Sequence, residues 1–382
     1  MKVLFISHTA MGGPFVVGSH QLARAMVRLG HNVLHLSPPI TPAHLMLFGN
    51  SFERTRFKRW LRGGDEIEGV IDVVPASFLS WGVARLLGSG FHKFGNGVKR
   101  EALKSLDHYK FLCPDIVFID EPRLGYLLDF LNCQRIVYRP TDIYAKLRND
   151  LSIIEAEKAV ISRSNAFIAT SQPVADHLYE LGVTSPLVME NGVEIEHFMD
   201  GLDFDIELEL PPKPRAIYAG ALDERFGADI LDVAAKHNPN VSFLLLGPAN
   251  GSVQAKLKKH CNVHFIGPVS YNHLPSYLRR SQVGLLPLSA HSSNEGRSPM
   301  KLFEYAATGL SVISTATAEI SRRKLPFVHL ARTDEEFSRL IADAVQTPLP
   351  EQYCIESAKL HSWTNKAQVA LDYAQHQGSK PC

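Results

Sequence analysis

Short apolar runs alternate with amphipathic segments over most of the chain. Residues 3–6 (VLFI) have the character of a buried strand, and residues 19–29 place their apolar side chains on one face of a helix that ends at Gly30. Similar strand-like runs, bounded by polar residues or proline, follow at 33–36, 115–119, 135–138 and 166–169. This alternation predicts βαβ units and a parallel sheet with helices on both faces.

The alternation stops and then restarts. An acidic run leads to Pro211, Pro212 and Pro214, after which strand-like runs recur at 216–219, 241–246, 263–266, 283–287 and 311–314. We therefore predict an α/β protein with two Rossmann-like parallel-sheet domains, whose ligand cleft lies at the carboxyl ends of both sheets. The expected bounds are 1–200, a linker at 201–214, 215–360, and a final helix at 361–382 that is a candidate to cross back to the first domain.

Composition narrows the class of protein. A length of 382 residues suits two domains, and 45% hydrophobic with 21% charged residues is ordinary for a globular chain. The net charge of +1 argues against a nucleic-acid-binding protein that works by bulk charge. Five scattered cysteines indicate reduced thiols in the cytoplasm. The first apolar run is too short for a signal peptide, and no stretch of 18 apolar residues predicts a membrane span.

The segment from 290 to 315 carries the most specific chemistry. A polar loop leads to Pro299 at a plausible first helical turn, and Lys301 adds a positive charge where helix amides already favour an anion. Glu304 lies three residues later on nearly the same face, where a carboxylate suits the ribose diol of a nucleotide. Taken alone, Lys301 and Glu304 are better explained as a solvated helix pair.

This segment resembles the donor-binding core of GT-B glycosyltransferases. Residues 298–312, SPMKLFEYAATGLSV, follow the pattern SPxKxxEYxAxGxPV with Ser311 in place of proline. Residues 265–287, FIGPVSYNHLPSYLRRSQVGLLP, follow FxGxVxxxxLPxYxxxxDVxLxP with Gln282 in place of aspartate. ENGV at 190–193 and Ser362–Trp363 are further matches. The resemblance is specific between 262 and 315.

The resemblance implies a nucleotide-sugar donor, most plausibly a UDP-sugar, with no other cofactor and no metal. In that family the 267–271 loop cups the base, the lysine meets the diphosphate and the glutamate holds the ribose. Carried over to this chain, the donor-binding residues are Gly220, Arg225, Gly247, Gly267, Pro268, Tyr271, Ser298, Pro299, Met300, Lys301 and Glu304.

A candidate general base follows the run at 135–138. Asp142 falls at a strand's carboxyl end, where a carboxylate can take the proton of an attacking hydroxyl. The stretch YRPTD resembles the VYRxSD strand end of xanthan-type glucuronosyltransferases, in which that aspartate is the base of an inverting reaction. Asp120 and Glu121 are rivals, with Glu121 a candidate to orient acceptor or base. Asp142 could instead cap the following helix.

The first strand–helix turn contains Gly12 and Gly13, which permit close backbone approach to a ligand. His8, on the same turn, could contact the leaving group or acceptor, or be structural. The turn has no GxGxxG fingerprint, and the chain has no Walker lysine motif.

Residues 45–106 depart from the strand–helix rhythm and suggest a membrane-facing insertion. Basic residues alternate there with aromatic and aliphatic ones, which suits anionic lipid headgroups. The proposed contact residues are Arg56, Lys58, Arg59, Trp60 and Arg62. An ordinary insertion whose aromatic residues pack inward is the alternative.

Together with these residues, the resemblance implies a metal-independent, inverting glycosyltransferase. It would pass a hexosyl or uronosyl group to a carbohydrate hydroxyl, carried on a polyprenyl diphosphate, in surface polysaccharide assembly at the inner face of the cytoplasmic membrane. Glu295 and Glu304 are nine residues apart instead of the eight usual in retaining relatives, which disfavours retention. A retaining enzyme, a nucleotide-sugar 2-epimerase of the same fold and a non-catalytic sugar-nucleotide-binding protein remain alternatives.

Overall fold

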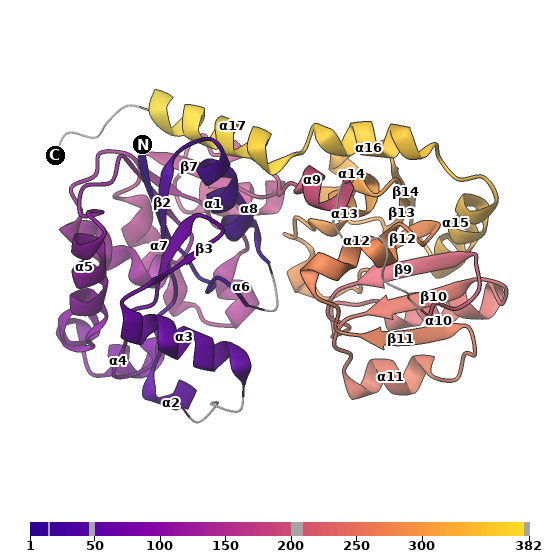
Figure 1. The fold of residues 1–382 in the computed structure, drawn as a ribbon, viewed down its shortest axis with the longest axis horizontal. Coiled ribbons are helices and arrows are strands. Elements are labelled where there is room, and N and C mark those ends of the chain that lie inside the picture. Colours follow the sequence, from indigo (N-terminus) through magenta and orange to yellow (C-terminus); the bar gives the residue numbers. More distant parts are fainter. Residues whose placement is uncertain (14–15, 46–49, 200–208, 378–382) are drawn as a thin grey trace. The chain divides into compact units, whose positions relative to one another are not determined.

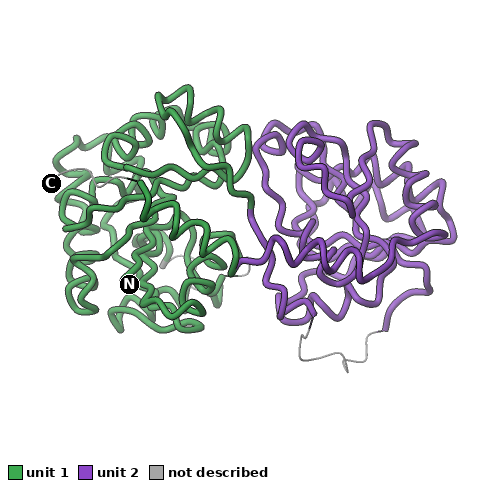
Figure 2. The backbone as a smooth tube through the Cα atoms, turned by 90° about the horizontal axis from the view of Figure 1, so that it is seen from above, with its two compact units in different colours: residues 1–190, 364–382 green, residues 191–363 purple. Residues whose placement is uncertain are grey.

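Both predicted sheets are present in the computed structural model, which describes residues 1–13, 16–45, 50–199 and 209–377 (Figure 1). The chain divides into two compact units, residues 1–190 with 364–382, and residues 191–363 (Figure 2). The chain passes between the units at Glu190–Asn191, before the linker expected at 201–214. Residues 201–208 of that linker lie outside the described ranges, and residues 209–214 lie in the second unit.

The first unit is built on an eight-stranded sheet with the order β3-β4-β2-β1-β5-β6-β7-β8, in which β3 pairs antiparallel with β4 and all other neighbours are parallel. Its central strands are apolar on both faces, and Leu4 and Val117 are fully buried opposite each other in register. The strands are β1 (Lys2–Ile6), β2 (Asn32–Leu36), β3 (Asp65–Ile67), β4 (Val70–Val73), β5 (Ile116–Ile119), β6 (Ile136–Tyr138), β7 (Ala166–Ala169) and β8 (Leu187–Val188).

Helices complete the first unit. They are α1 (Gly18–Arg28), α2 (Pro42–Leu45), α3 (Ser51–Arg62), α4 (Trp81–Leu86), the π-helical turn η1 (Phe91–Gly95), α5 (Val98–His108), the 3-10 helix η2 (Pro122–Phe130), α6 (Tyr144–Arg148), α7 (Ser152–Ile161), α8 (Gln172–Glu180) and α17 (Trp363–His376). From Thr364 onward α17 belongs to this unit, where Leu371 is buried and the Tyr373 hydroxyl donates to the Ser185 carbonyl over 3.3 Å.

The segment predicted as an insertion contributes to the sheet itself. β3 and β4 form a hairpin, and β4 pairs with β2 so that Leu36 lies opposite Val73. Asp72 interrupts the apolar run of β4 and is fully buried, since Arg59 and the ring of His35 compensate its charge. That buried acid hides the strand in the sequence.

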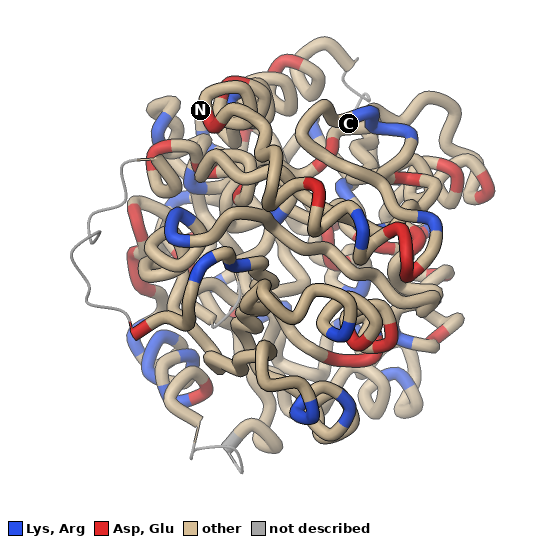
Figure 3. The backbone as a smooth tube through the Cα atoms, turned by 90° about the vertical axis from the view of Figure 1, so that its right-hand side faces the viewer, with Lys and Arg blue, Asp and Glu red and all other residues tan. Residues whose placement is uncertain are grey.

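The second unit contains a six-stranded parallel sheet with the order β11-β10-β9-β12-β13-β14. Its strands are β9 (Arg215–Ala219), β10 (Ser242–Leu246), β11 (Val263–Gly267), β12 (Val283–Leu286), β13 (Ser311–Thr315) and β14 (Val328–Ala331). Its helices are α9 (Ile195–Met199), α10 (Ala228–His237), α11 (Gly251–Leu257), η3 (Tyr271–His273), α12 (Leu274–Leu278), η4 (Ser292–Asn294), α13 (Lys301–Ala307), α14 (Ala318–Arg323), α15 (Asp334–Gln346) and α16 (Glu351–Lys359). Along the chain seen in Figure 3, Lys and Arg positions are interspersed with Asp and Glu.

Candidate functional site

Three glycines occupy the carboxyl ends of neighbouring strands in the second unit. Gly220 follows β9, Gly247 follows β10 and Gly267 ends β11, with φ of +152°, +135° and +84°. A Cβ on Gly247 would lie 2.0 Å from the Gly220 carbonyl oxygen, and one on Gly220 would lie 2.4 Å from Lys301 Nζ. Side chains are excluded at Gly220 and Gly247, so this part of the sheet edge presents backbone beside the lysine.

Lys301 is the first residue of α13, and the predicted first-turn residue Pro299 precedes the helix. The Lys301 ammonium group lies 4.3 Å from the centroid of the Tyr218 ring. Burial, reinforced by the nearby charge of Arg297, lowers the pKa of Lys301 to about 7. Burial raises the pKa of Glu304 to about 7, against the opposing effect of Lys301. A negatively charged ligand would therefore restore the full charge of the lysine.

The loop before α13 is fixed by the start of the second unit. The Asn191 backbone N–H donates to Ser298 Oγ over 2.9 Å, and Asn191 Nδ2 donates to the Ser298 carbonyl, also over 2.9 Å. Pro299 is buried, and Met300 is the residue before the first helical residue. The ENGV motif thus holds the 298–300 loop, and direct ligand contacts from these three residues stay a prediction.

Arg225 belongs to the electrostatic surroundings of Lys301. Its Nε donates to Asp223 over 3.1 Å, and this hydrogen bonding lowers the pKa of Asp223 against the effect of burial. The charge of Arg225 helps to lower the pKa of Lys301, while that of Asp223 raises it. The charge of Arg225 is thus felt by the lysine, and its role in donor binding stays a prediction.

The predicted base-cupping loop is only partly open. The Tyr271 ring stacks on His197 of α9 with centroids 4.2 Å apart and planes 5° from parallel, so one ring face is already covered. Pro268 is exposed, and nothing lies within 4 Å of a Cβ placed on Gly267. Base recognition by this loop stays a prediction. The space that a base could occupy lies at Gly267 and Pro268.

In the first unit, polar residues gather where β1 and β5 end. Asp120 is buried and accepts hydrogen bonds from the His8 backbone N–H over 2.7 Å and from the hydroxyls of Ser7 and Ser19. His8 Nδ1 forms an ion pair with Asp120 Oδ1 over 3.1 Å, although the geometry of this contact is not that of a hydrogen bond. Burial alone would lower the pKa of His8, but Asp120 outweighs it and raises that pKa. The pKa of Asp120 falls well below its usual range, despite burial, because of His8.

The two other predicted carboxylates differ in their engagement. Glu121 is buried and accepts from Arg123 Nε over 2.8 Å, with Arg148 Nη1 3.5 Å away. Asp142 is half-buried, and its charge contributes to the raised pKa of His8. The helix after it begins at Tyr144 with residue 143 in the capping position, so Asp142 is not its N-cap. The charge of Asp142 therefore acts on His8, whereas Glu121 interacts with two arginines.

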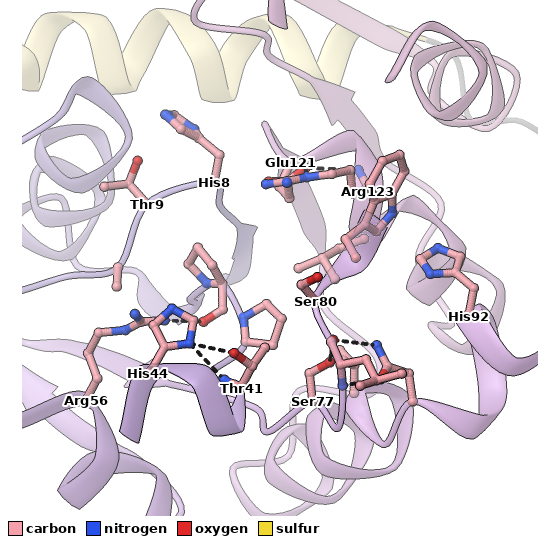
Figure 4. Close-up of a pocket in the computed structure, with 18 of the residues that line it drawn as sticks. His8, Thr9, Thr41, His44, Arg56, Ser77, Ser80, His92, Glu121 and Arg123 are labelled. Atoms are coloured by element: carbon pink, nitrogen blue, oxygen red, sulfur yellow. Dashed lines mark hydrogen bonds and ion pairs between the residues drawn. The ribbon is translucent and has the colours of Figure 1, made fainter. Parts of the chain in front are cut away.

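A pocket of about 510 Å³ opens beside His8 in the first unit (Figure 4). His8 and the Glu121–Arg123 pair come from the ends of β1 and β5, and further lining comes from α2, α3, α4 and η1. Other lining residues are Thr9, Thr41, His44, Phe52, Arg56, Leu79, Trp81, His92, Leu124 and Tyr126. The pocket is thus apolar with a few convergent polar groups, which is the usual character of a small-molecule site.

Within the described part of the chain, four nitrogen atoms of the pocket-lining residues are buried without hydrogen-bond partners, namely His8 Nδ1, Arg56 Nε, Trp81 Nε1 and His92 Nδ1. His8 is ion-paired with Asp120, and Arg56 bonds through its terminal nitrogens. That leaves Trp81 and His92, whose rings meet edge to face with centroids 5.8 Å apart. A buried polar atom without a partner costs stability, so these two are natural anchors for a bound molecule. Sequence reasoning missed their pairing, because their roles depend on how α4 and η1 fold together.

The glycines of the N-terminal turn have different surroundings. A Cβ on Gly12 would lie 3.3 Å from Arg59 Nη2 at a φ of +72°, and a Cβ on Gly13 would lie 3.1 Å from the Phe52 ring. Each glycine therefore lies close to a protein side chain. Of the two, Gly13 lines the pocket.

The predicted membrane-facing residues of α3 are wrong in part. Arg56 and Arg59 are buried: Arg56 bonds Glu53 and the Pro38 carbonyl, and Arg59 pairs with Asp72. Trp60 is half-buried and donates to Glu101 over 3.2 Å. On the helix, Lys58 and Arg62 remain exposed. The basic run turns inward because buried carboxylates and carbonyls require cations or donors.

The described residues also bear on metal binding and membrane spanning. The described ranges contain no group of three or more His, Cys, Asp and Glu residues that could hold a metal ion. None of their helices combines the length and apolar character needed to cross a bilayer. Metal independence itself stays a prediction.

Comparison with known proteins supports the predicted class. Residues 213–346 match the family model described as glycosyl transferases group 1. The chain also resembles GT-B structures over its length, which confirms the predicted fold. The superposition on sucrose-phosphate synthase from Thermosynechococcus elongatus has a TM-score of 0.71 at 15% sequence identity and covers 98% of each of the two chains. The Anabaena protein HepE, in complex with UDP and glucose, has a TM-score of 0.68 at 14% identity, covering 97% of this chain and 99% of HepE.

One sequence relative is more specific. The chain is 24% identical over 324 residues to a putative teichuronic acid biosynthesis glycosyltransferase, TuaH, of Bacillus subtilis strain 168. The alignment covers 73% of this chain and 80% of TuaH. These findings support a GT-B glycosyltransferase of group 1, and the narrower resemblance to xanthan-type glucuronosyltransferases stays a prediction.

Proposed function

We propose that this chain transfers a hexosyl or uronosyl group from a UDP-sugar to a carbohydrate hydroxyl in surface polysaccharide assembly. The observation that carries the proposal is Lys301, partly buried within the group 1 family match, beside side-chain-free backbone at Gly220 and Gly247. A desolvated cation beside backbone that carries no side chains suits a diphosphate leaving group, which can approach it closely. The name of TuaH supports a polysaccharide product, and the UDP in the HepE complex supports the nucleotide.

The acceptor is assigned to the first-unit pocket. Its apolar lining and its unpartnered Trp81 and His92 nitrogens support a ligand with both apolar and polar parts. A sugar on a polyprenyl diphosphate at the inner face of the cytoplasmic membrane has this mixed character. Arg56 and His44 add cationic or polar character to the wall opposite His8 (Figure 4).

His8 is proposed as the general base, with Asp142 as the alternative predicted from the sequence. The acceptor oxygen attacks the anomeric carbon, the bond from that carbon to the diphosphate breaks, and His8 Nε2 takes the hydroxyl proton. Asp120 orients the ring through Nδ1 and stabilises the imidazolium that forms. Lys301 stabilises the departing UDP. One base with direct displacement inverts the anomeric configuration.

The donor site is tested by calorimetry with UDP. Lys301→Ala should weaken binding by ~1.5–3 kcal/mol, the usual range for charged hydrogen bonds. Lys258→Ala, which removes an exposed lysine from the same unit, serves as the control and should bind UDP normally. Unchanged affinity in Lys301→Ala would reject the donor assignment.

The base is tested by turnover and stereochemistry. His8→Gln should slow transfer ~100–10,000-fold while UDP binding persists, and Asp142→Asn should stay within about tenfold of the parent protein. The reverse ranking would make Asp142 the base. NMR of the product reports the anomeric configuration, and retention would overturn the single-displacement mechanism. If the enzyme converts the sugar of the UDP-sugar to its epimer when no acceptor is present, it is an epimerase.

A further inference from the structure

A surface of the first unit exposes large apolar side chains. It comprises α4, η1 and the residues flanking them, and we call it the α4–η1 surface. Leu86 is 84% exposed, and Leu87 and Phe94 are each 58% exposed. Phe78 and Val83 are also among the exposed large hydrophobic residues of this segment. Five such side chains within 17 residues are more than the scattered exposure of single apolar residues that is normal.

The helix α4 carries its apolar residues on its outer side. Val83, Leu86 and Leu87 have the spacing i, i+3, i+4 and therefore share one helix face, while Ala84 is the buried residue of the helix. Hydrogen bonds between residues that flank α4 and η1 hold this surface in place. Asn96 bonds the Leu79 backbone in both directions, over 2.8 and 3.1 Å. The outward apolar face is thus fixed by the fold beneath it.

Positive charge accompanies these apolar residues. Between Asp72 and Glu101 the chain contains no acidic residue, but it contains Arg85, Lys93, Lys99 and Arg100. Within the described ranges Lys93 has no ion pair, and Lys99 lies 4.7 Å from the Phe94 ring centroid. Two acids approach from outside the segment: Glu155, 3.8 Å from Arg85, and Glu101, 3.3 Å from Arg100. The surface remains cationic after these two pairs are counted.

We propose that the α4–η1 surface docks onto an anionic lipid bilayer. Exposed leucine and phenylalanine side chains enter the boundary between headgroups and acyl chains, while Arg85, Lys93 and Lys99 meet the headgroups. A second copy of the chain is a poorer occupant, because a two-fold interface would set this cationic surface against itself. Leu79, Trp81 and His92 from the same segment line the pocket. An acceptor anchored in the bilayer would therefore reach the pocket without leaving the membrane surface.

The experiment is vesicle co-sedimentation of the full chain without donor or acceptor, so failure here leaves the proposed transfer reaction intact. Vesicles of phosphatidylcholine alone are compared with vesicles containing about one-third phosphatidylglycerol. Leu86→Ser/Leu87→Ser/Phe94→Ser removes apolar contact, and Arg85→Ser/Lys93→Ser removes charge. Leu151→Ser/Leu360→Ser is the matched apolar control, since both residues are more than 70% exposed elsewhere. Lys58→Ser/Arg62→Ser tests α3.

The parent protein should bind the anionic vesicles and release at high salt. The apolar and charge variants should each lower the partition coefficient roughly tenfold or more, while the two control variants stay within about twofold. Unchanged melting temperatures show that all variants fold. No binding to either vesicle, equal binding to both, or full binding by the apolar variant overturns the proposal. So does loss of binding in Lys58→Ser/Arg62→Ser alone, or gel filtration showing a dimer that the apolar variant dissolves.

Discussion

At the scale of single residues, burial changes the protonation of Lys301. Its pKa of about 7 leaves a substantial neutral fraction at pH 8, and a bound diphosphate would raise that pKa again. UDP binding at pH 8 should therefore take up protons, as much as about one per site. Calorimetry in buffers of different ionisation enthalpy measures this uptake as a slope. Lys301→Met should lose the slope, and a parent protein without one would contradict the coupling. Because Glu304 titrates in the same range, the measured midpoint belongs to the pair.

His8 should set the acid limb of the pH–rate profile. Only the neutral ring accepts a proton, so kcat/KM should rise as pH passes upward through the raised pKa. Asp120→Asn removes the charge that raises this pKa, so the limb should move to lower pH while the maximum rate falls. Fold stability changes with pH in the opposite direction to kcat/KM. The His8–Asp120 pair stabilises the fold fully below the unfolded pKa of ~6.5, and this contribution is lost as pH rises through the folded pKa. If the acid limb of the pH–rate profile does not move in Asp120→Asn, titration of His8 does not set it.

At the scale of elements, the ends of β9 and β10 tolerate no side chains. Gly247→Ala places a Cβ 2.0 Å from the Gly220 carbonyl at a φ of +135°, so it should destabilise the second unit by ~1–3 kcal/mol and weaken UDP binding. Gly251→Ala is the matched control, since it begins α11 with nothing within 4 Å of the new Cβ. That change should be neutral or slightly stabilising. Thermal unfolding followed by circular dichroism compares them, and equal melting temperatures would refute the crowding argument.

The elements also show what sequence alone could predict. The central strands were predictable because they are short, wholly apolar runs, and the GT-B donor core was predictable because its motif lies in one continuous segment. β4 was hidden by Asp72, whose burial depends on Arg59 of α3. The same pair explains why the basic run of α3 was misread as lipid-facing. The charge of Arg59 does not reveal in the sequence which way its side chain points, because its partner Asp72 is 13 residues away.

The pocket was beyond sequence reasoning for a related reason. Its walls come from separate elements, and Trp81 and His92 meet only because α4 and η1 pack together. The His8–Asp120 contact likewise joins residues 112 positions apart, across the neighbouring strands β1 and β5. Strand order is the missing information, since it decides which strand-end residues become neighbours.

At the scale of the whole molecule, α17 should decide the stability of the first unit. Leu371 is buried, so Leu371→Ala should cost ~2–5 kcal/mol. Val369→Ala on the same helix is the control, because Val369 is 46% exposed and its loss should cost little. Scanning calorimetry should show the transition of the first unit moving down while that of the second unit stays. A shift of the second transition alone would contradict the assignment of α17.

The discontinuous first unit also constrains the order of events during synthesis. Its residues 1–190 leave the ribosome first, but its closing helix follows only after about 170 residues of the second unit. At ~5–20 residues per second, the helix arrives roughly 9–35 seconds later. During that interval the surface that Leu371 covers is open to solvent or chaperones, while the second unit can already fold around its own continuous segment. A nascent chain stalled before residue 364 would therefore carry a complete second unit and an incomplete first unit.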